Sequence, residues 1–484
     1  MPRPSVAEFC DLAGRYNVVP VWDTYLADRD TPVSAYEKLV GDHPGFLLES
    51  VEGGERWAQW SFIGWEPAFT LTSRGGRVDS ETALAPGDPL EVLAAVVGRH
   101  SAPDLEGLPP LHSGLVGFLG YDCVRYLERL PNAPADDRGL PEMAWQAVGA
   151  LAAFDRFAQT ITLVRNVYVG SDPERQYRAA VAAITSDAQR LGRARGYRVA
   201  RRSDPAQSGE VSSTMSRADF EAAVRAAQES IRKGDAFQVV LSQRLGTDYP
   251  GDHFSVYRAL RLINPSPYLY YLRHPELTVV GSSPELMTRA RDGMVFSRPI
   301  AGTRPRGATV EEDRRLEAEL LADPKERAEH VMLIDLARND LGRVCEFGTV
   351  EVDDLMVVER YSHVMHMVSG ISGKLRPGLG PVDILRATFP HGTVSGAPKV
   401  AAMEIIDRLE PVARGPYAGA VGYLDFSGNV DTAICLRTVV LAREQAWVQA
   451  GAGIVHDSDP AAEYDETMNK AAAALAALAH ADHV

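Results

Sequence analysis

Two segments of the sequence begin alike and place pairs of carboxylates at helical spacing. Residues 323–330 read Asp-Pro-Lys-Glu-Arg-Ala-Glu-His, and residues 459–466 read Asp-Pro-Ala-Ala-Glu-Tyr-Asp-Glu. Asp as N-cap with Pro at the first helical position is typical of a helix start, so two acids lie three residues apart on one face of each helix. The pairs are Glu326 with Glu329 and Glu463 with Glu466. For one such helix alone, solvent-facing acids that stabilise the helix dipole by ~0.3–1 kcal/mol are the favoured interpretation.

A metal site becomes the more specific hypothesis because, in both helices, the acid pair is followed by apolar residues typical of a buried core. Residues 331–334, Val-Met-Leu-Ile, follow the first pair, and the alanine-rich segment 471–479 follows the second. Four converging carboxylates need a cation, and ligation by oxygen alone suits Mg²⁺, which keeps waters and often binds a substrate oxygen. A di-iron centre would require Glu-x-x-His, whereas the residues three beyond Glu326 and Glu463 are glutamates.

An acidic protein that binds an anionic substrate needs local donors or cations, and four features offer them. The small-residue loop at 392–399 leads into a predicted helix with Pro398 near its start, where free backbone N–H groups can bind a carboxylate. It does not match a phosphate-binding P-loop. The other features are the strand end at 451–453, Arg437 in a predicted strand, and Lys470 one turn beyond Glu466. Turn glycines, a capped helix and surface cations explain these features at least equally well.

Two histidines, His363 and His366, lie in the strand-like segment 361–369. In a strand they point to opposite faces, so at most one faces a given site. Such a histidine can act as a general acid or base near neutral pH, although a buried structural histidine is the commoner case. The sequence has neither a Gly-x-Ser-x-Gly elbow nor a Ser/His/Asp order, so hydrolase chemistry lacks support.

The elements that must position these residues fall into two halves. Short β-branched and aromatic segments alternate with turns from residue 18 to about 169, which predicts a β-rich first half. A helix is expected from Pro173 to Leu191, the polar stretch 201–215 reads as a linker, and Ser216 caps the next helix. The later predicted strands are 236–241, 277–281, 418–426, 433–441 and 446–451, and the later predicted helices are 324–338, 398–409 and 460–479.

Strands do not alternate regularly with helices, which disfavours a doubly wound parallel sheet. We expect an α+β fold of two domains with largely antiparallel sheets flanked by helices. The expected domains are a β-rich one at 1–200 and one at 216–484 that contains the acid pairs and the other candidate site residues, joined by the linker at 201–215. If the two sheets exchange strands, the spatial boundary lies elsewhere than in that linker.

Composition sets the remaining limits. The chain has 484 residues, 45% of them apolar, and a formal charge of −15 from 50 Lys and Arg against 65 Asp and Glu. This predicts more than one domain and argues against a nucleic-acid partner. The four cysteines form no cluster, which indicates neither a disulfide framework nor zinc and fits a reducing cytoplasm. The start lacks a signal peptide and no apolar run reaches ~18 residues, so we expect a soluble, unexported protein without a membrane partner.

Four ordered motifs together resemble the chorismate-utilising enzymes, and among these the large subunits of anthranilate synthases. The motifs are residues 299–307, 329–341, 393–399 and 465–470. The resemblance covers the second half almost continuously and the first half more loosely. It implies Mg²⁺-dependent conversion of chorismate and ammonia into anthranilate and pyruvate.

The resemblance also implies roles for individual residues. By similarity, Glu329 and Glu466 are the direct Mg²⁺ ligands, and Glu326 and Glu463 support them through water. His366 is implied in acid/base chemistry, with Glu285 and Thr393 as further catalytic residues. The implied substrate-binding positions are Gln238, Ala301, Gly302, Thr303, Tyr423, Arg437, Gly451, Ala452, Gly453 and Lys470.

Two positions discriminate within the family. Ala301 stands where 4-amino-4-deoxychorismate synthases commonly carry a nucleophilic lysine, and a methyl group cannot attack the ring. Gln238 stands where isochorismate and salicylate synthases carry a lysine that activates water, so external ammonia is the expected nucleophile. Both point to anthranilate, while enzymes that stop at aminodeoxyisochorismate are not excluded. The rival from another class is a catalytically inactive amino-acid sensor, against which the four intact acids weigh.

Ammonia delivery and feedback are further implications of the resemblance. The surroundings of Cys123 do not form the Gly-x-Cys-x-Gly nucleophile segment of a glutaminase, so a separate glutamine amidotransferase chain is the expected partner in a hetero-oligomer. Segments 47–50 and 264–268 resemble those that bind tryptophan as an inhibitor, although a strand end and a β-turn explain them equally well. The implied inhibitor contacts are Glu49, Ser50, Pro267, Tyr268 and Leu269.

Overall fold

The computed structural model describes residues 2–50, 59–194, 196, 210–361 and 364–481, and two large antiparallel sheets form its centre. The first sheet has 12 strands. In spatial order they are β1 (Val18–Leu26), β9 (Thr160–Tyr168), β8 (Ala150–Asp155), β3 (Trp60–Trp65), β2 (Gly45–Glu49), β12 (Tyr268–Arg273), β13 (Thr278–Ser283), β22 (Thr438–Ala442), β23 (Gln445–Ile454), β11 (Gln238–Asp248) and β10 (Ser212–Ser213), with β19 (Gly396–Ala397) paired to β11.

The second sheet has 11 strands and lies against the first. In spatial order they are β16 (Ile300–Pro305), β18 (Val364–Lys374), β15 (Met294–Ser297), β14 (Leu286–Arg291), β21 (Val430–Ile434), β20 (Ala420–Leu424), β6 (Leu115–Leu119), β7 (Met143–Ala147), β4 (Thr70–Arg74) and β5 (Arg77–Asp79), with β17 (Glu351–Arg360) paired to β18. Both sheets draw strands from both halves of the sequence. A boundary at residues 201–215 therefore does not divide the sheets, and residues 201–209 of that predicted linker lie outside the described residues.

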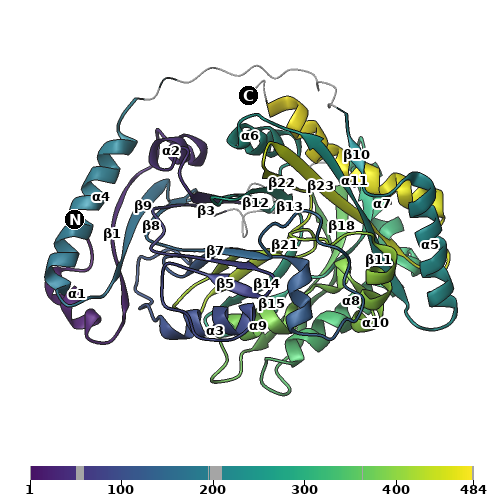
Figure 1. The fold of residues 1–484 in the computed structure, drawn as a ribbon, viewed down its shortest axis with the longest axis horizontal. Coiled ribbons are helices and arrows are strands. Elements are labelled where there is room, and N and C mark those ends of the chain that lie inside the picture. Colours follow the sequence, from purple (N-terminus) through teal and green to yellow (C-terminus); the bar gives the residue numbers. More distant parts are fainter. Residues whose placement is uncertain (1, 51–58, 195, 197–209, 362–363, 482–484) are drawn as a thin grey trace.

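Helices cover the outer faces of the stacked sheets, so the fold has four layers (Figure 1). Those packed on the first sheet are α1 (Val6–Ala13), α2 (Pro32–Leu39), α4 (Pro173–Leu191), α5 (Arg217–Arg232), α6 (His253–Ile263) and α11 (Pro460–His480). Those packed on the second are α3 (Pro89–Arg99), α7 (Val310–Ala322), α8 (Pro324–Gly342) and α9 (Pro381–Thr388). The helix α10 (Lys399–Leu409) contacts β11, and the short 3-10 helices are η1 (Tyr121–Tyr126) and η2 (Gly392–Val394). No helix in the described ranges is long and apolar enough to cross a membrane.

The α+β class with largely antiparallel sheets is confirmed, and so are the helices with clear local signals. The prediction for α4 matches both of its ends, and α8 and α11 begin at their predicted prolines. The single strand predicted at 433–441 is wrong. The chain leaves β21 of the second sheet after Ile434 and enters β22 of the first sheet at Thr438. A continuous β-branched run does not reveal such a change of layer, because both strands are buried.

A buried ion pair joins the segments that lie beside the candidate site. Arg414 is fully buried, and its guanidinium donates to Glu410 at 2.8 and 2.6 Å, to the carbonyl of Val394 at 2.8 Å and to that of Val240 at 2.7 Å. Glu410 in turn accepts hydrogen bonds from the N–H and hydroxyl of Ser242 at 2.7 and 2.8 Å. The pair thereby fixes β11 and the 392–395 loop to the end of α10.

Glu410→Gln is expected to lower the free energy of unfolding by about 3–5 kcal/mol, because it leaves the Arg414 charge buried without a counter-charge. The measurement is urea denaturation. Glu174→Gln on the exposed face of α4, where Glu174 pairs with Arg178, is the matched control and should cost less than about 1 kcal/mol. Equal losses in the two variants would contradict a special role for the buried pair.

Candidate active site

The floor of the candidate active site is the place where β11 begins beside β23. Gln238 opens β11, and Gly451 and Gly453 lie on the paired stretch of β23. A Cβ at Gly451 would lie 2.6 Å from the hydroxyl of Tyr417 and 2.7 Å from a backbone carbonyl, so only glycine fits there. A Cβ at Gly453 would lie 2.7 Å from Nε2 of Gln238. Ala452 belongs to the core beneath α5 and α10, so only its backbone is available to the site.

Both predicted acid-bearing helices reach this floor. Gln238 donates from Nε2 to Oε1 of Glu329 on α8 at 3.2 Å. On α11, Lys470 donates to the carbonyl of Gly451 at 3.1 Å and forms an ion pair with Glu466 at 2.6 Å. The structure thus brings together the two predicted metal ligands, the strand glycines and the predicted cation.

Burial and neighbouring acids raise the pKa values of Glu329 on α8 and Glu463 on α11. Burial raises the pKa of Glu329, and the negative charges of Glu326 and Glu466 raise it further. Burial likewise raises the pKa of Glu463, which also faces the charge of Glu466. Arg304 compensates part of this charge, because it forms an ion pair with Glu326 at 2.9 Å. The region around Glu329 therefore favours an added cation.

These residues fit a hydrated divalent cation by the chemistry of their donors. Within the described residues, no group of three or more His, Cys, Asp or Glu side chains is already arranged to hold a metal ion. Mg²⁺ does not need such a cage, since it keeps several waters and commonly takes one or two carboxylates together with substrate oxygens. The repulsion around Glu329 and the buried Oε1 of Gln238, which has no partner in the described part, suit such an ion and its ligands.

Glu285 lies buried near Lys470, in surroundings that favour a neutral carboxylic acid. Burial raises the pKa of Glu285 to about 8, although Thr393 and Lys470 act to lower it. Nδ1 of His391 lies 3.7 Å from Oε1 of Glu285 and 2.8 Å from the hydroxyl of Thr393. Burial lowers the pKa of His391 to about 3, so its imidazole stays neutral. In the described part of the chain, Oε1 of Glu285 is buried without a hydrogen-bond partner, and it suits the donation of a proton to a bound ligand.

His366 on β18 has a strand on either side. Thr303 on β16 and Glu359 on β17 stand opposite it, and the Thr303 hydroxyl lies 2.9 Å from Nδ1 of His366. Burial lowers the pKa of His366 and the charge of Arg437 lowers it further, whereas a hydrogen bond to the backbone of Gly302 acts in the opposite direction. The neutral imidazole is therefore available as a base. His363, the other histidine of the segment, lies outside the described residues.

The strand β16 brings the predicted residues Ala301 and Gly302 close to α8. Gly302 has a φ of +68°, and a Cβ there would lie 2.8 Å from Leu320 and 3.1 Å from Oε2 of Glu326. Ala301 is buried and offers only a methyl group. The glycine thus allows the close approach of β16 and α8 on which the position of Glu326 depends.

Two predicted substrate-binding residues lie in unexpected places. Arg437 is not within a strand. It lies in the crossover from β21 to β22 with a φ of +47°, and its Nη1 donates to Oδ1 of Asn264 at 3.4 Å. Tyr423 lines a cavity between the sheets, and Tyr417 occupies the place against Gly451. Sequence reasoning missed Tyr417 and His391; their positions near Arg414 and Thr393 were the only available signals.

The loop at 392–399 contributes differently from the prediction. The N–H groups of Val394 and Ser395 donate to carbonyls within the same loop, and Pro398, which caps α10, has no N–H. Lys399 forms a buried ion pair with Asp340 at 2.9 Å. The N–H groups of Val394 and Ser395 are therefore not free for a ligand, and the loop also supplies the side chain of Thr393.

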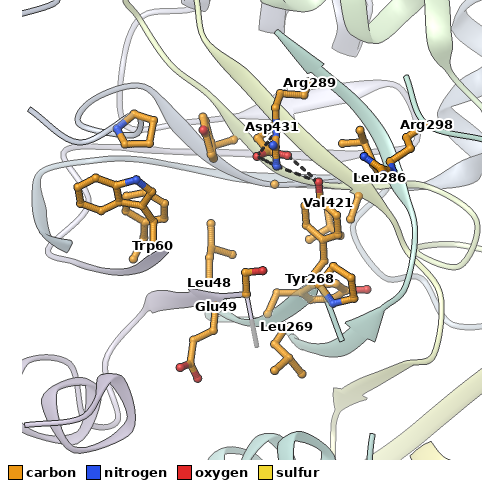
Figure 2. Close-up of a pocket in the computed structure, with 18 of the residues that line it drawn as sticks. Leu48, Glu49, Trp60, Tyr268, Leu269, Leu286, Arg289, Arg298, Val421 and Asp431 are labelled. Carbon is orange, nitrogen blue, oxygen red and sulfur yellow. Dashed lines mark hydrogen bonds and ion pairs between the residues drawn. The ribbon is translucent and has the colours of Figure 1, made fainter. Parts of the chain in front are cut away.

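A cavity of about 220 Å³ lies between the two sheets (Figure 2). All of the predicted inhibitor contacts line it, namely Glu49, Ser50, Pro267, Tyr268 and Leu269. The Tyr268 hydroxyl donates to Asp431 at 3.2 Å, and Arg289 contacts both groups. The hydroxyl of Ser50 is buried without a partner among the described residues, so it can bind a ligand.

Two of these predicted contacts turn their side chains away from the cavity (Figure 2). Tyr257 and Arg261 on α6 bind the Glu49 carboxylate on the outer face of the first sheet. Leu269 belongs to the hydrophobic core on that same outer face. Because side chains alternate along a strand, Glu49 and Leu269 reach the cavity only through their backbone.

Comparison with known proteins gives the same family over the whole fold. The profile of the chorismate binding enzyme family matches residues 44–476. Anthranilate synthase component 1 from Acetivibrio thermocellus is 45% identical, with 99% of each chain covered. The protein of that name from Mycolicibacterium smegmatis is 48% identical, with 98% of this chain and 93% of the relative covered.

Comparison with solved structures indicates the same family and fold. The crystal structure of anthranilate synthase component I from Streptococcus pneumoniae TIGR4 aligns with a TM-score of 0.79 at 36% identity, covering 93% of this chain and 99% of that one. The menaquinone-specific isochorismate synthase from Escherichia coli shares the fold, with a TM-score of 0.72 at 18% identity over 98% of this chain and 99% of that one. The chain therefore belongs to the chorismate binding enzyme family and, within it, to the anthranilate synthase component 1 group.

Proposed function

We propose that this chain converts chorismate and ammonia into anthranilate, pyruvate and water, with Mg²⁺ as the cofactor, as the first committed step of tryptophan biosynthesis. The observation that carries the proposal is the meeting of the two acid-bearing helices at Gln238 and Gly451, with a protonated Glu285 near Lys470 and a neutral His366 near Arg437. The 45–48% identity to anthranilate synthase component 1 over nearly the whole chain supports it.

Glu329 and Glu466 would hold Mg²⁺ directly, and Glu326 and Glu463 would bind its waters. When bound, Mg²⁺ neutralises the ring carboxylate of chorismate, so that a dicarboxylate is accepted beside four acids. Lys470 and the Tyr417 hydroxyl lie at the same floor, and together with Arg437 they would bind the remaining anionic and polar groups of the substrate.

The protein groups then handle the protons. Glu285, protonated at neutral pH, donates a proton to the departing ring hydroxyl, which leaves as water while ammonia adds at the carbon beside the carboxylate-bearing carbon. His366 takes the ring proton as the enolpyruvyl group leaves and the ring becomes aromatic. Thr303 and Thr393 orient these two groups through their hydroxyls.

Ammonia is the favoured nucleophile because neither Gln238 nor Ala301 carries a basic nitrogen that could activate water or attack the ring. Gln238 carries an amide that is bonded to Glu329, and Ala301 carries a methyl group. These two residues disfavour water attack and covalent attack by the enzyme, respectively. The rival products are 4-amino-4-deoxychorismate and aminodeoxyisochorismate, and the rival outside catalysis is an amino-acid sensor.

We also propose a partner, a regulator and a location. A glutamine amidotransferase subunit would supply ammonia, which agrees with the name component 1 of the relatives. Tryptophan would bind in the cavity between the sheets and inhibit the enzyme. The predicted contacts support this, Glu49 and Leu269 only through their backbone, and so does the buried Ser50 hydroxyl, which has no partner among the described residues. Four unpaired cysteines agree with a reducing cytoplasm.

The direct test of the activity is to incubate the purified chain with chorismate, MgCl₂ and an ammonium salt and to identify the products by mass spectrometry. Anthranilate and pyruvate in equal amounts are expected. Accumulation of aminodeoxychorismate or another non-aromatic amine would overturn the proposed product. Binding of an amino acid without any turnover of chorismate would favour the sensor.

Glu285→Gln is expected to lower kcat by about 10²–10⁴-fold, because the amide cannot donate an acidic proton. In the unsubstituted protein, kcat at a fixed concentration of free ammonia should fall as pH rises through about 8, where Glu285 loses its proton. The residual activity of Glu285→Gln should lack this decrease. A decrease of the same shape in both proteins would assign the titration to another group.

Glu329→Gln and Glu466→Gln are each expected to nearly abolish turnover and to weaken Mg²⁺ binding, since each removes one of few charged ligands. Isothermal titration with Mg²⁺ in the presence of chorismate measures the binding directly. Glu174→Gln, at an exposed position of α4, is the control for loss of one negative charge. Full activity and unchanged Mg²⁺ affinity in both variants would refute the ligand assignment.

Ser50→Ala is expected to raise the tryptophan concentration for half-inhibition about fivefold to tenfold or more, because one hydrogen bond to a ligand contributes about 1 kcal/mol. Turnover without tryptophan should stay close to that of the unsubstituted protein. The assay is ammonium-dependent anthranilate formation, which is fluorescent, over a tryptophan series. Unchanged inhibition would place the inhibitor elsewhere.

A further inference from the structure

The inter-sheet cavity and the candidate active site share a wall. Arg298, Glu359 and Tyr361 line the cavity on the side of β16, β17 and β18. The central strand of these three, β18, carries His366. Glu359 stands directly opposite His366 in the register of β17 and β18, so the two residues are cross-strand neighbours.

Tyr361 connects this wall to His366 by direct contact. Its ring lies 5.6 Å from the imidazole, centre to centre, at an interplanar angle of 63°, which is an edge-to-face arrangement. Its hydroxyl donates to Oε2 of Glu359 at 3.0 Å, and Glu359 also forms an ion pair with Arg298. The backbone carbonyl of Tyr361 accepts a hydrogen bond from Arg306 at 2.7 Å.

His366 is thus held on two sides by different groups. Thr303 binds its Nδ1, and the ring of Tyr361 limits the tilt of the imidazole. The Thr303 side belongs to the active site, whereas Tyr361 also lines the cavity. A ligand that contacts Tyr361, or that draws Glu359 or Arg298 from their pair, therefore changes the packing of His366 without contacting the substrate.

We propose that Tyr361 is a positioning residue for His366 and the residue through which occupancy of the cavity changes the active site. The inference rests on the proposed function of the cavity as an inhibitory amino-acid site and assigns the step that links the two sites. Coupling of this kind requires that the inhibitor and the substrate favour different placements of the Tyr361 ring. The Glu359–Arg298 pair gives the phenol a defined position from which it can be displaced.

Coupling between two binding sites is reciprocal, so the proposed link can be tested by binding measurements at equilibrium. If tryptophan weakens chorismate binding through Tyr361, chorismate must weaken tryptophan binding by the same factor. Tryptophan is titrated calorimetrically into the protein with Mg²⁺, with and without saturating chorismate and without ammonia, and the ratio of the two affinities is the coupling factor. We expect a ratio of about tenfold for the unsubstituted protein, within the usual range for coupled sites.

Three variants separate the link from the inhibitor site. Tyr361→Leu removes the ring contact, so the ratio should fall close to one while tryptophan still binds. Its ammonium-dependent kcat should fall severalfold with little change in the KM for chorismate. Tyr361→Phe keeps the ring and should restore kcat. Ser50→Ala is the matched control, in which tryptophan binds more weakly with and without chorismate and the ratio is preserved.

The possible results distinguish the role of Tyr361 from the proposed inhibitor site on which that role rests. Absence of tryptophan binding, or a ratio of one, in the unsubstituted protein would overturn the proposed inhibitor site and the link together. A normal ratio in Tyr361→Leu would overturn only the role of Tyr361. Glu359→Gln, which weakens the anchor of the phenol without removing a ring, covers the case in which Tyr361→Leu does not fold. An unchanged ratio in Glu359→Gln would then overturn the link.

Discussion

The buried contact between Arg414 and Glu410 is the constraint on which the site geometry depends. The guanidinium binds carbonyls of β11 and of the 392–395 loop, and its central carbon lies 4.5 Å and 5.6 Å from the ring centres of Tyr121 and Tyr417. One side chain therefore fixes three parts of the site relative to one another. These are Gln238 at the start of β11, the loop that carries Thr393, and Tyr417. Burying this pair is costly unless each polar group is satisfied, and here hydrogen bonds from Ser242 and to two backbone carbonyls supply further partners to both members.

Candidate site groups from distant parts of the second half of the sequence meet because that half contributes strands to both sheets. The first sheet supplies Gln238 and Gly451, the second supplies Thr303 and His366, and Arg437 lies in the crossover between the sheets. The same stacking leaves the inter-sheet cavity beside β16 to β18. The candidate active site and a second cavity thus share structural elements, which would be the physical basis for the proposed coupling between them.

Features with a local cause could be predicted from the sequence. Asp-Pro starts place α8 and α11 correctly, because capping and the fixed φ of proline act within one turn. The meeting of Glu329 with Gln238 required knowledge of the family, since no local rule relates residues 91 positions apart. The change of layer between β21 and β22 and the place of Tyr417 against Gly451 were missed, because both depend on sheet topology. Glu49 and Leu269 were predicted from the segments that contain them. A segment alone does not show to which face of the sheet each side chain of a strand points.

The central claim is that α8 and α11 together present a Mg²⁺ site to chorismate above β23. The most direct measurement is anomalous diffraction from crystals of the chain grown with Mn²⁺ in place of Mg²⁺ and with chorismate, without ammonia. The account predicts one anomalous peak within bonding distance of the carboxylates of Glu329 and Glu466 and of a substrate carboxylate. A peak bound by other residues, or chorismate bound away from Gly451, would contradict it.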